Sequence, residues 1–258
     1  MDILSTKGEK LAERPETGDP TIADRVFTTL HSAILTLQMP PGSKFSEAEI
    51  AKQLGVSRQP VREAFIRLAQ IEFVRIQPKR ATEVCKISEA AVLNARFIRE
   101  ALEAAVVRDA CENCSDELID QLEDIVERQR KAVAVNEREL FHDLDDAFHR
   151  SIAEGSGRGL VWTLINEQKA QMDRVRYLSL AFNEPVVIRE HAAIIDALRD
   201  RATSRAETAM RHHLSRINSL IAVLRQQHPQ YFAATQAVQG TDAGPLNLRV
   251  PALVKPAR

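Results

Sequence analysis

The sequence is poor in cysteine and aromatic residues and has no long apolar run. Three cysteines occur among 258 residues, an odd number that is too small for a disulfide framework and favours a reducing compartment. Because no stretch of about 18 apolar residues is present, we expect no membrane-spanning helix. The first residues carry no apolar segment after a basic start, so we expect no secretion signal and predict a cytoplasmic protein.

Two of the cysteines form the sequence CENC, with Cys111 and Cys114 three positions apart. This spacing occurs in redox and metal sites, but there it is accompanied by a second pair or by a βαβ pattern. Neither accompanies it in this sequence. We therefore interpret both cysteines as small residues near a helix end.

Composition and charge favour two modest domains, one of which meets a polyanion. Hydrophobic residues make up 44% and charged residues 28% of the chain, which is ordinary for a protein with apolar cores. The net charge is −1, yet residues 21–86 hold ten basic and six acidic side chains, a charge of +4, which leaves −5 on the remainder. A basic module joined to an acidic one is typical of proteins that bind nucleic acid with one part.

The basic module, residues 19–86, follows a polar segment (1–18) that we expect to be a flexible tail. Apolar residues spaced three and four apart predict a helix from Thr21 to the turn at PPG. The sequence SEAE is a capping box that opens a second helix ending at Gly55. A third helix follows Ser57, and the runs FVRI and ATEV then predict a two-stranded wing around QPKR. The expected fold is a winged helix-turn-helix.

The sequence GVSRQPVREAF, residues 55–65, predicts a recognition helix. Pro60 fits the first turn, where the backbone N–H groups have no partner within the helix. Arg58 and Arg62 lie on one side of that helix with Gln59 beside them, and such side chains can pair with guanine and adenine edges. Ser57 and the helix N-terminus suit a phosphate. The alternative is a surface helix with solvated arginines.

The stretch PPGSKFSEAEIAKQLGVSRQPVREAFIRLAQ resembles the DNA-binding domain of the GntR family of bacterial transcription regulators. The resemblance implies that side chains of the recognition helix contact DNA and that two basic residues lie in the wing. Glu72 and Ala81 stand where glycine is common in that family, so we expect stiffer turns around the wing. The implied DNA-binding residues are Ser57, Arg58, Gln59, Arg62, Lys79 and Arg80.

From Ser88 onward the pattern is helical throughout, with breaks at polar or Gly/Pro sequences. We expect an all-α bundle of about six helices in residues 87–229 and a second flexible tail over 230–258. The protein is thus predicted to be mainly α. The expected helices are 88–112, 115–135, 137–153, 159–182, 185–200 and 204–225.

Histidine and aspartate recur on inward faces of these helices. Asp145 and His149 are four residues apart and can point the same way, while His191 and His213 lie on or beside the apolar faces of later helices. His212 points nearly opposite to its neighbour, but His142 shares a face with His149, so the pattern alone does not choose between them. Three imidazoles and a carboxylate suit Zn²⁺, Ni²⁺ or a similar divalent ion. Buried histidines that only make core hydrogen bonds are the alternative.

This half also resembles the FCD domain, the helical ligand-binding domain of the FadR-like branch of the same regulators. The shared sequences are DDAFH, EHAAI and MRHHL, together with R-x-x-L-E at residues 99–103. By that resemblance the metal ligands are Asp145, His149, His191 and His213, and Arg99 meets an anionic effector. Arg158 stands where the family often has asparagine, so we expect the pocket or the dimer surface to differ at this position.

Together these patterns predict a homodimeric regulator, most often a repressor in this family, that binds a near-palindromic DNA operator and responds to a small carboxylate at a metal site. One alternative is a metalloenzyme that uses the same histidines to activate water. Against this alternative, the sequence has no convincing general-base motif, and an enzyme would not explain residues 46–80. Another alternative is a regulator with a purely structural histidine cluster.

Overall fold

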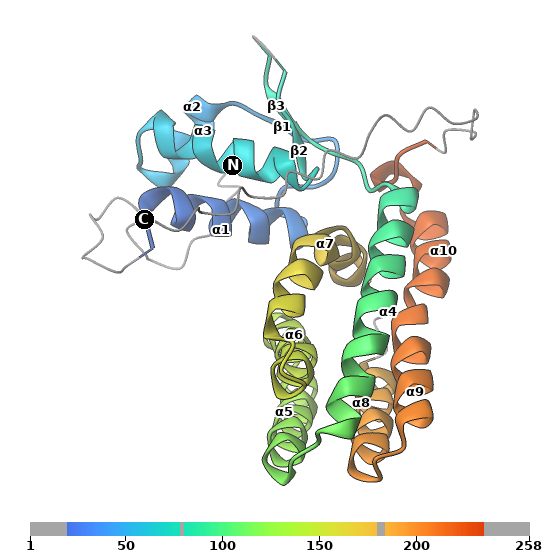
Figure 1. The fold of residues 1–258 in the computed structure, drawn as a ribbon. Helices are drawn as coiled ribbons and strands as arrows, with labels where there is room; N and C mark the ends of the chain where they lie inside the picture. The colour runs from blue at the N-terminus through green and yellow to red at the C-terminus, as the bar shows by residue number, and fades with distance from the viewer. Residues whose placement is uncertain (1–19, 78–79, 180–183, 235–258) are drawn as a thin grey trace, which may run out of the picture.

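A computed structural model describes residues 20–77, 80–179 and 184–234. A small head, residues 20 to about 86, lies across one end of a taller helical body (Figure 1). The tail expected over 1–18, most of the one expected over 230–258, and Lys79 lie outside the described residues. None of the helices in the described ranges is long and apolar enough to cross a membrane.

The head contains the predicted winged helix-turn-helix. Its helices are α1 (Ile22–Leu35), α2 (Glu47–Leu54) and α3 (Arg58–Gln70). Capping boxes begin two of them: the Thr21 side chain accepts from the Asp24 N–H at α1, and Ser46 accepts from Glu49 at α2. Gly55 ends α2 with φ of 67°, a left-handed conformation that glycine adopts without strain. These local signals place the turn between α2 and α3 where the sequence predicted it.

The wing belongs to a three-stranded sheet, one strand more than expected. Strands β2 (Val74–Arg75) and β3 (Thr82–Val84) are the two predicted runs, and β1 (Lys44–Phe45) pairs antiparallel with the other edge of β3. A two-residue strand leaves too short an alternation to be recognised in a sequence. Glu72 has φ of 60°, so this non-glycine residue adopts the left-handed turn that the family usually builds with glycine.

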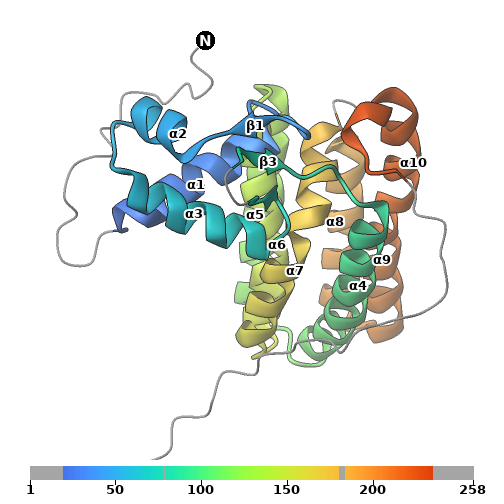
Figure 2. The ribbon, with the colours of Figure 1, turned by 90° about the horizontal axis from the view of Figure 1, so that it is seen from above.

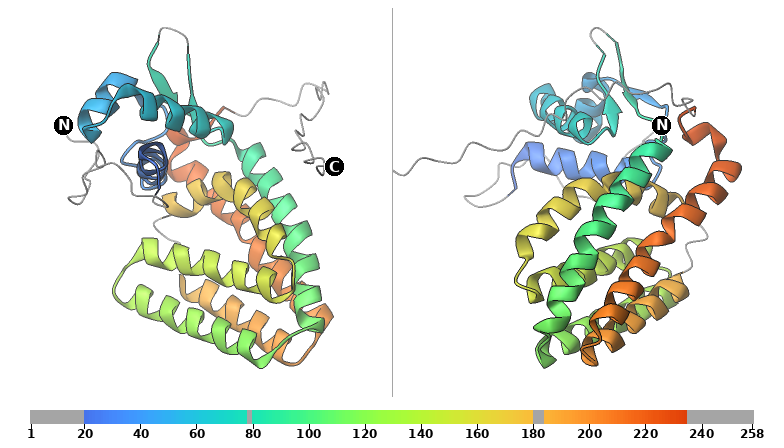
Figure 3. Two further views of the ribbon diagram at one scale, coloured as in Figure 1. Left: turned by 60° about the vertical axis from the view of Figure 1, so that its left-hand side comes forward. Right: turned by 45° about the vertical axis from the view of Figure 1, so that its right-hand side comes forward.

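The helical body contains seven helices in the described residues: α4 (Glu89–Glu112), α5 (Asp116–Ala134), α6 (Arg138–Gly155), α7 (Gly159–Leu178), α8 (Glu184–Arg199), α9 (Thr203–Ser215) and α10 (Ile217–Gln227). The last expected helix, 204–225, is therefore two, because the chain breaks at Arg216. Helices α5 and α6 pack side by side at the far end of the body, and α9 packs along α4 (Figure 3).

The chain remains packed beyond the expected start of the second tail. The 3₁₀ turn η1 (Pro229–Tyr231) follows α10, and Phe232 is buried. Backbone hydrogen bonds join this segment to Ile87, which donates to Tyr231 and accepts from Ala233. Residues 231–233, which the sequence placed in the tail, therefore pack on the body, where a buried aromatic ring lies next to the start of α4.

Helix α7 joins the body to the head, and Figure 2 shows α1 and α3 beside it. Ala170 packs into the core of the head. The Gln171 side chain donates to the carbonyl of Ile71 at 2.8 Å, and Arg174 donates to the carbonyl of Cys85 at 2.5 Å. The guanidinium of Arg174 also lies 5.3 Å from the centre of the Phe73 ring. Contacts of several kinds therefore hold the head on the body.

Candidate metal centre and DNA-binding surface

Four side chains from three helices meet inside the body. Asp145 and His149 come from α6, His191 from α8 and His213 from α9, and one ligand atom of each lies within 4.8 Å of all the others. The aspartate and the first histidine share a face because four residues make about one helical turn. We call these four residues the metal-binding cluster, because their donor atoms could hold a metal ion.

Each imidazole of the cluster has an oxygen next to its Nδ1 atom. Nδ1 of His149 lies 2.5 Å from Glu103 Oε2, that of His191 lies 2.9 Å from Gln129 Oε1, and that of His213 lies 3.0 Å from Glu190 Oε2. The contacts of His191 and His213 are hydrogen bonds to oxygens that can only accept, so Nδ1 of these two rings carries the hydrogen. The contact of His149 with Glu103 is an ion-pair distance without hydrogen-bond geometry. Nε2 of His191 and Nε2 of His213 therefore present lone pairs, as in histidines that bind metals with the other ring nitrogen held by a hydrogen bond.

These lone pairs point at one another and at Asp145. Nε2 of His149 and Nε2 of His213 are 3.2 Å apart, and Nε2 of His191 lies 3.5 Å from Asp145 Oδ1. Among the described residues, neither His191 Nε2 nor Asp145 Oδ1 has a hydrogen-bond partner, although both atoms are buried. Orphaned buried acceptors are costly, and a cation at their centre would satisfy them, so these residues fit a divalent ion.

The protonation states also fit metal binding. Burial lowers the pKa of His191 well below the usual histidine range, and the neighbouring His213 lowers it further. Burial likewise lowers the pKa of His213. Burial alone would raise the pKa of the Asp145 carboxyl, but Arg176 and the imidazoles outweigh it and hold that pKa well below its usual range. Neutral imidazoles and an ionised carboxylate are the forms that bind metal ions.

His142 and His212, the two histidines next to the cluster residues in the sequence patterns, have other surroundings. The His142 ring stacks on Tyr177 with 4.2 Å between ring centroids, and burial together with Arg176 lowers its pKa to about 3. His212 points outward, with 72% of its side chain exposed. The ambiguity between His142 and His149 on the helical wheel is thus resolved by packing, since only His149 reaches the other cluster residues.

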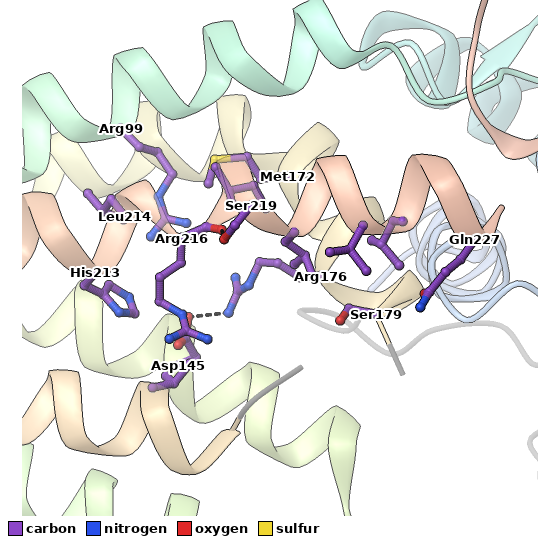
Figure 4. A pocket seen from close by; sticks show the side chains of 15 residues that line it. Arg99, Asp145, Met172, Arg176, Ser179, His213, Leu214, Arg216, Ser219 and Gln227 are labelled. Atoms are coloured by element: carbon purple, nitrogen blue, oxygen red, sulfur yellow. Dashed lines mark hydrogen bonds and ion pairs between the residues drawn. The ribbon is translucent and has the colours of Figure 1, made fainter. Parts of the chain in front are cut away.

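A cavity of about 260 Å³ borders the metal-binding cluster. Arg99, Asp145, Arg176, His213 and Arg216 lie around its polar end (Figure 4). Arg99 is buried and its Nε atom donates to Glu103 at 2.6 Å, while its Nη2 atom is buried without a hydrogen-bond partner in the described part of the chain. A guanidinium N–H of this kind is available to an anion that enters the cavity.

The predicted DNA-reading side chains lie on the free face of the head. Val61, Ala64 and Phe65 bury the other face of α3, which leaves Arg58, Gln59 and Arg62 exposed. Arg62 forms two hydrogen bonds of 3.1 Å with Glu47, and Gln59 donates to Glu63 at 2.9 Å. These exposed pairs are weak, so a nucleic acid can replace the acidic partners.

Two predicted residues of this surface, Ser57 and Lys79, need separate description. Ser57 occupies the N-cap position of α3, but within the described residues its hydroxyl makes no capping hydrogen bond. An exposed hydroxyl at a helix N-terminus remains available to a phosphate. In the wing, Arg80 is exposed, whereas Lys79 lies outside the described residues.

Comparison with known proteins assigns a protein family to each half of the chain. Residues 22–84 match the family described as bacterial regulatory proteins, gntR family, and residues 95–216 match the FCD domain. The HTH-type transcriptional repressor RspR of Escherichia coli is 36% identical over 214 residues, which cover 82% of this chain and 94% of RspR. The chain belongs to the GntR family of transcription regulators, in the group with an FCD domain.

Other GntR-family proteins agree with this assignment. The HTH-type transcriptional repressor NanR of Klebsiella aerogenes is 27% identical over 241 residues, covering 84% of this chain and 92% of NanR. The solved structure of E. coli McbR/YncC superposes with a TM-score of 0.66 at 22% identity, over 81% of this chain and all of that one. The family and these relatives indicate a transcription regulator rather than a metalloenzyme.

Sequence reasoning missed the residues that orient the metal-binding cluster. Glu190 precedes His191 in EHAAI, and Glu103 is the last residue of the R-x-x-L-E sequence. Both residues belong to sequences singled out above, but no role was predicted for either of them. Gln129 and Arg176 carry no local signal, because their partners are 62 and 31 residues away in the chain. Only the packing of α5 and α7 against α6 and α8 brings them to the site.

The two cysteines of CENC lie where α4 ends and the next helix begins. Both are buried and free, and Cys111 Sγ lies 3.8 Å from the carbonyl of Ala197. Burial raises the pKa of the Cys114 thiol, which disfavours the reactive thiolate form. Both pack as small residues at the end of a helix.

Proposed function

We propose that this protein is a repressor whose affinity for a DNA operator depends on a divalent ion and a small carboxylate bound in its FCD domain. The observation that carries the proposal is the convergence of three imidazoles and Asp145, with one ligand atom of each within 4.8 Å of the others and with Nδ1 of each ring next to an oxygen. Among the described residues, Nε2 of His191 and Oδ1 of Asp145 are buried at this point without a hydrogen-bond partner, and a cluster that served stability alone would be expected to pair them.

Zn²⁺ and Ni²⁺ are the ions that this donor set favours, because imidazole nitrogen suits both. The ligands would be Asp145, His149, His191 and His213. A bound ion would supply positive charge and open coordination positions next to the cavity. Arg99 then supplies a buried N–H group on the same side, so a carboxylate would meet two cationic centres.

Helix α7 supports coupling between this site and the head. Arg176 donates to Asp145 of the metal-binding cluster at 2.5 Å and to Asp173 at 3.2 Å. Lys169 lies 2.5 Å from Asp173, one turn earlier in the same helix. The same helix carries Ala170, Gln171 and Arg174, which contact the head. A change of charge at Asp145 is therefore linked by buried ion pairs to the surface that positions the DNA-binding helices.

GntR regulators bind DNA operators and typically dimerise, and we propose that this chain dimerises through adjoining faces of α4 and α7. Leu93 and Phe97 of α4 are 38% and 67% exposed, and Leu160 and Leu164 of α7 are 77% and 49% exposed. Large apolar side chains gathered on neighbouring helices favour association. A two-fold dimer would read the two halves of a near-palindromic operator.

The dimer proposal is tested by sedimentation of Phe97→Glu beside Val135→Glu, an equally exposed apolar position on another part of the body. The first substitution should shift the protein toward monomer, and the second should leave it dimeric. A monomeric wild-type chain, or a dimer that survives Phe97→Glu, would contradict the choice of surface.

The regulatory proposal is tested by measuring the affinity of the full chain for DNA from its own upstream region, with and without Zn²⁺ or Ni²⁺. A coupling of about 1–3 kcal/mol between the two sites, roughly 5–150-fold in operator affinity, is the expected size once metal and effector are present. Unchanged affinity in every combination would leave the metal-binding cluster with a structural role only.

A further inference from the structure

The cavity beside the metal-binding cluster differs strongly between its two ends. Its polar end holds three guanidinium groups together with one carboxylate and one imidazole of the cluster (Figure 4). Most of the remaining lining is apolar and comes from helices α7 to α10, and its polar side chains are Ser179, Ser219 and Gln227. A ligand that fills the cavity therefore needs a charged group at one end and an apolar group at the other.

The aliphatic wall follows α10 away from the metal-binding cluster. Ile217, Leu220 and Leu224 are spaced three and four residues apart, so they line one face of the helix. Val223 adds an exposed valine beside them, with 47% of its surface accessible. From Ile217 to Leu224 the apolar wall extends for about 10.5 Å, and Gln227 lies beyond it at the far end of the cavity (Figure 4).

We infer that the effector is an amphipathic monocarboxylate, with its carboxylate between the metal site and Arg99 and an aliphatic body along α10. This inference rests on the proposed function and narrows its carboxylate to one class. A second carboxylate or several hydroxyl groups would lie mainly against apolar side chains such as Leu220 and Leu224, since Ser179, Ser219 and Gln227 are the polar groups in this part of the lining. Most added polar groups would therefore lose their water without gaining partners.

Volume restricts the length of the ligand. The cavity of about 260 Å³ is at the lower limit of the roughly 300–1,000 Å³ found for small-molecule sites. A short or medium aliphatic chain fits this space, whereas a long fatty chain does not. Since Val223 and Gln227 are exposed, the far end of the ligand approaches solvent.

The test measures binding of acetate, butanoate, hexanoate and octanoate to the Zn²⁺-loaded full chain by calorimetry. Burial of each methylene should tighten binding by between about twofold and fourfold until the cavity is filled, so hexanoate should bind at least about sixteenfold more tightly than acetate. Hexanamide keeps the chain without the charge and should bind much more weakly. Hexanedioate adds a second carboxylate at the far end and should also bind more weakly than hexanoate.

Two matched variants test where the aliphatic chain of the ligand lies. Val223→Ser changes a residue of the cavity wall. It should weaken the binding of hexanoate by about threefold and leave the binding of acetate unchanged. Val135→Ser changes an exposed valine outside the cavity and should change neither acid. An affinity that does not rise with chain length, a dicarboxylate that binds more tightly than the monocarboxylate, or equal effects of the two variants would overturn the inference.

Operator affinity measured on the same preparations separates this inference from the proposed function. If hexanedioate or acetate alters operator binding while chain length has no effect, the regulatory proposal stands and the amphipathic ligand is wrong. If hexanoate binds with the expected chain-length dependence and operator affinity never changes, the ligand class stands and the regulatory role is wrong.

Discussion

The Nε2 atoms of His149 and His213 face each other across 3.2 Å in the interior of the helical body. Nδ1 of His213 is hydrogen-bonded to Glu190, and Nδ1 of His149 lies 2.5 Å from a Glu103 oxygen, an arrangement that favours lone pairs on both Nε2 atoms. Two lone pairs at that distance repel each other unless a proton or a cation lies between them. Metal binding would turn this repulsion into coordination.

His149→Ala should abolish tight binding of Zn²⁺ because it removes one of the converging lone pairs. His142→Ala is the matched control: it removes a buried histidine of the same helix that stacks on Tyr177 and should retain one ion per chain. Elemental analysis after dialysis measures the stoichiometry, and circular dichroism checks folding. Full zinc content in His149→Ala, or its loss in His142→Ala, would exclude the proposed ligand set.

Gln129→Leu should weaken Zn²⁺ binding by about 10–100-fold while the stoichiometry is unchanged. The Gln129 side chain contacts Nδ1 of His191 at 2.9 Å and is not itself one of the four proposed ligands. Without that oxygen the ring can rotate or take the other tautomer. Competition with a chromogenic chelator measures the affinity, and an unchanged value would show that packing against Phe148, 3.9 Å away between ring centroids, orients the ring by itself.

Arg62→Ala should relax base discrimination in the operator by about 1–3 kcal/mol at the position that Arg62 reads. Arg67→Ala is the control from the same helix, because Arg67 pairs with Asp24 of α1 at 2.8 Å. Fluorescence anisotropy with operators substituted one base pair at a time separates the two. If Arg62→Ala binds every substituted operator as the wild type does, Arg62 does not read bases, and the same measurement on Arg58→Ala tests its neighbour.

Arg80→Ala should weaken binding to operator and to unrelated DNA by the same factor. A phosphate contact carries no sequence information, and its loss should reduce the slope of log K against log salt by about one. Titrations at several salt concentrations measure the slope, and Lys79→Ala is expected to behave in the same way. A specific operator that loses affinity while random DNA does not would assign Arg80 to base recognition instead.

The stability of the head–body contact should fall as the pH is lowered from 7.5 to 5. His31 stacks between Phe27 and Phe73, near Asp173 and Lys169 of α7. Burial lowers its pKa and outweighs the opposite effect of Asp173. Because the folded-state pKa lies below the unfolded value of about 6.5, the unfolded chain binds more protons below that pH, and stability present above it is lost as the pH falls.

His31→Phe preserves a ring between the two phenylalanines and removes the titrating group. Urea unfolding of the metal-free protein should therefore show a smaller loss between pH 7.5 and 5 for this variant than for the wild type. Equal losses would mean that the other buried histidines account for the whole effect. An NMR titration of the His31 ring would confirm the direction of its pKa shift independently.

Local sequence was enough for much of the fold and part of the site. Capping boxes at Thr21 and Ser46, glycine at residue 55 and apolar residues at helical spacing define helices through contacts of a few residues. The i, i+4 spacing of Asp145 and His149 likewise follows from helix geometry alone. Strand β1 and the packing of Phe232 could not be predicted in this way, because both depend on partners far along the chain.

The sequence by itself determined the order of helices, the exposed arginines of α3 and the candidate ligands, since these follow from propensity, periodicity and motif spacing. The tertiary structure decided which histidines meet, which oxygens orient them, and that Arg99 has a buried N–H group beside an amphipathic cavity. Those facts depend on how α4 to α10 pack. Packing depends on many individually weak contacts between residues that are distant in the sequence, and local sequence patterns do not specify those contacts.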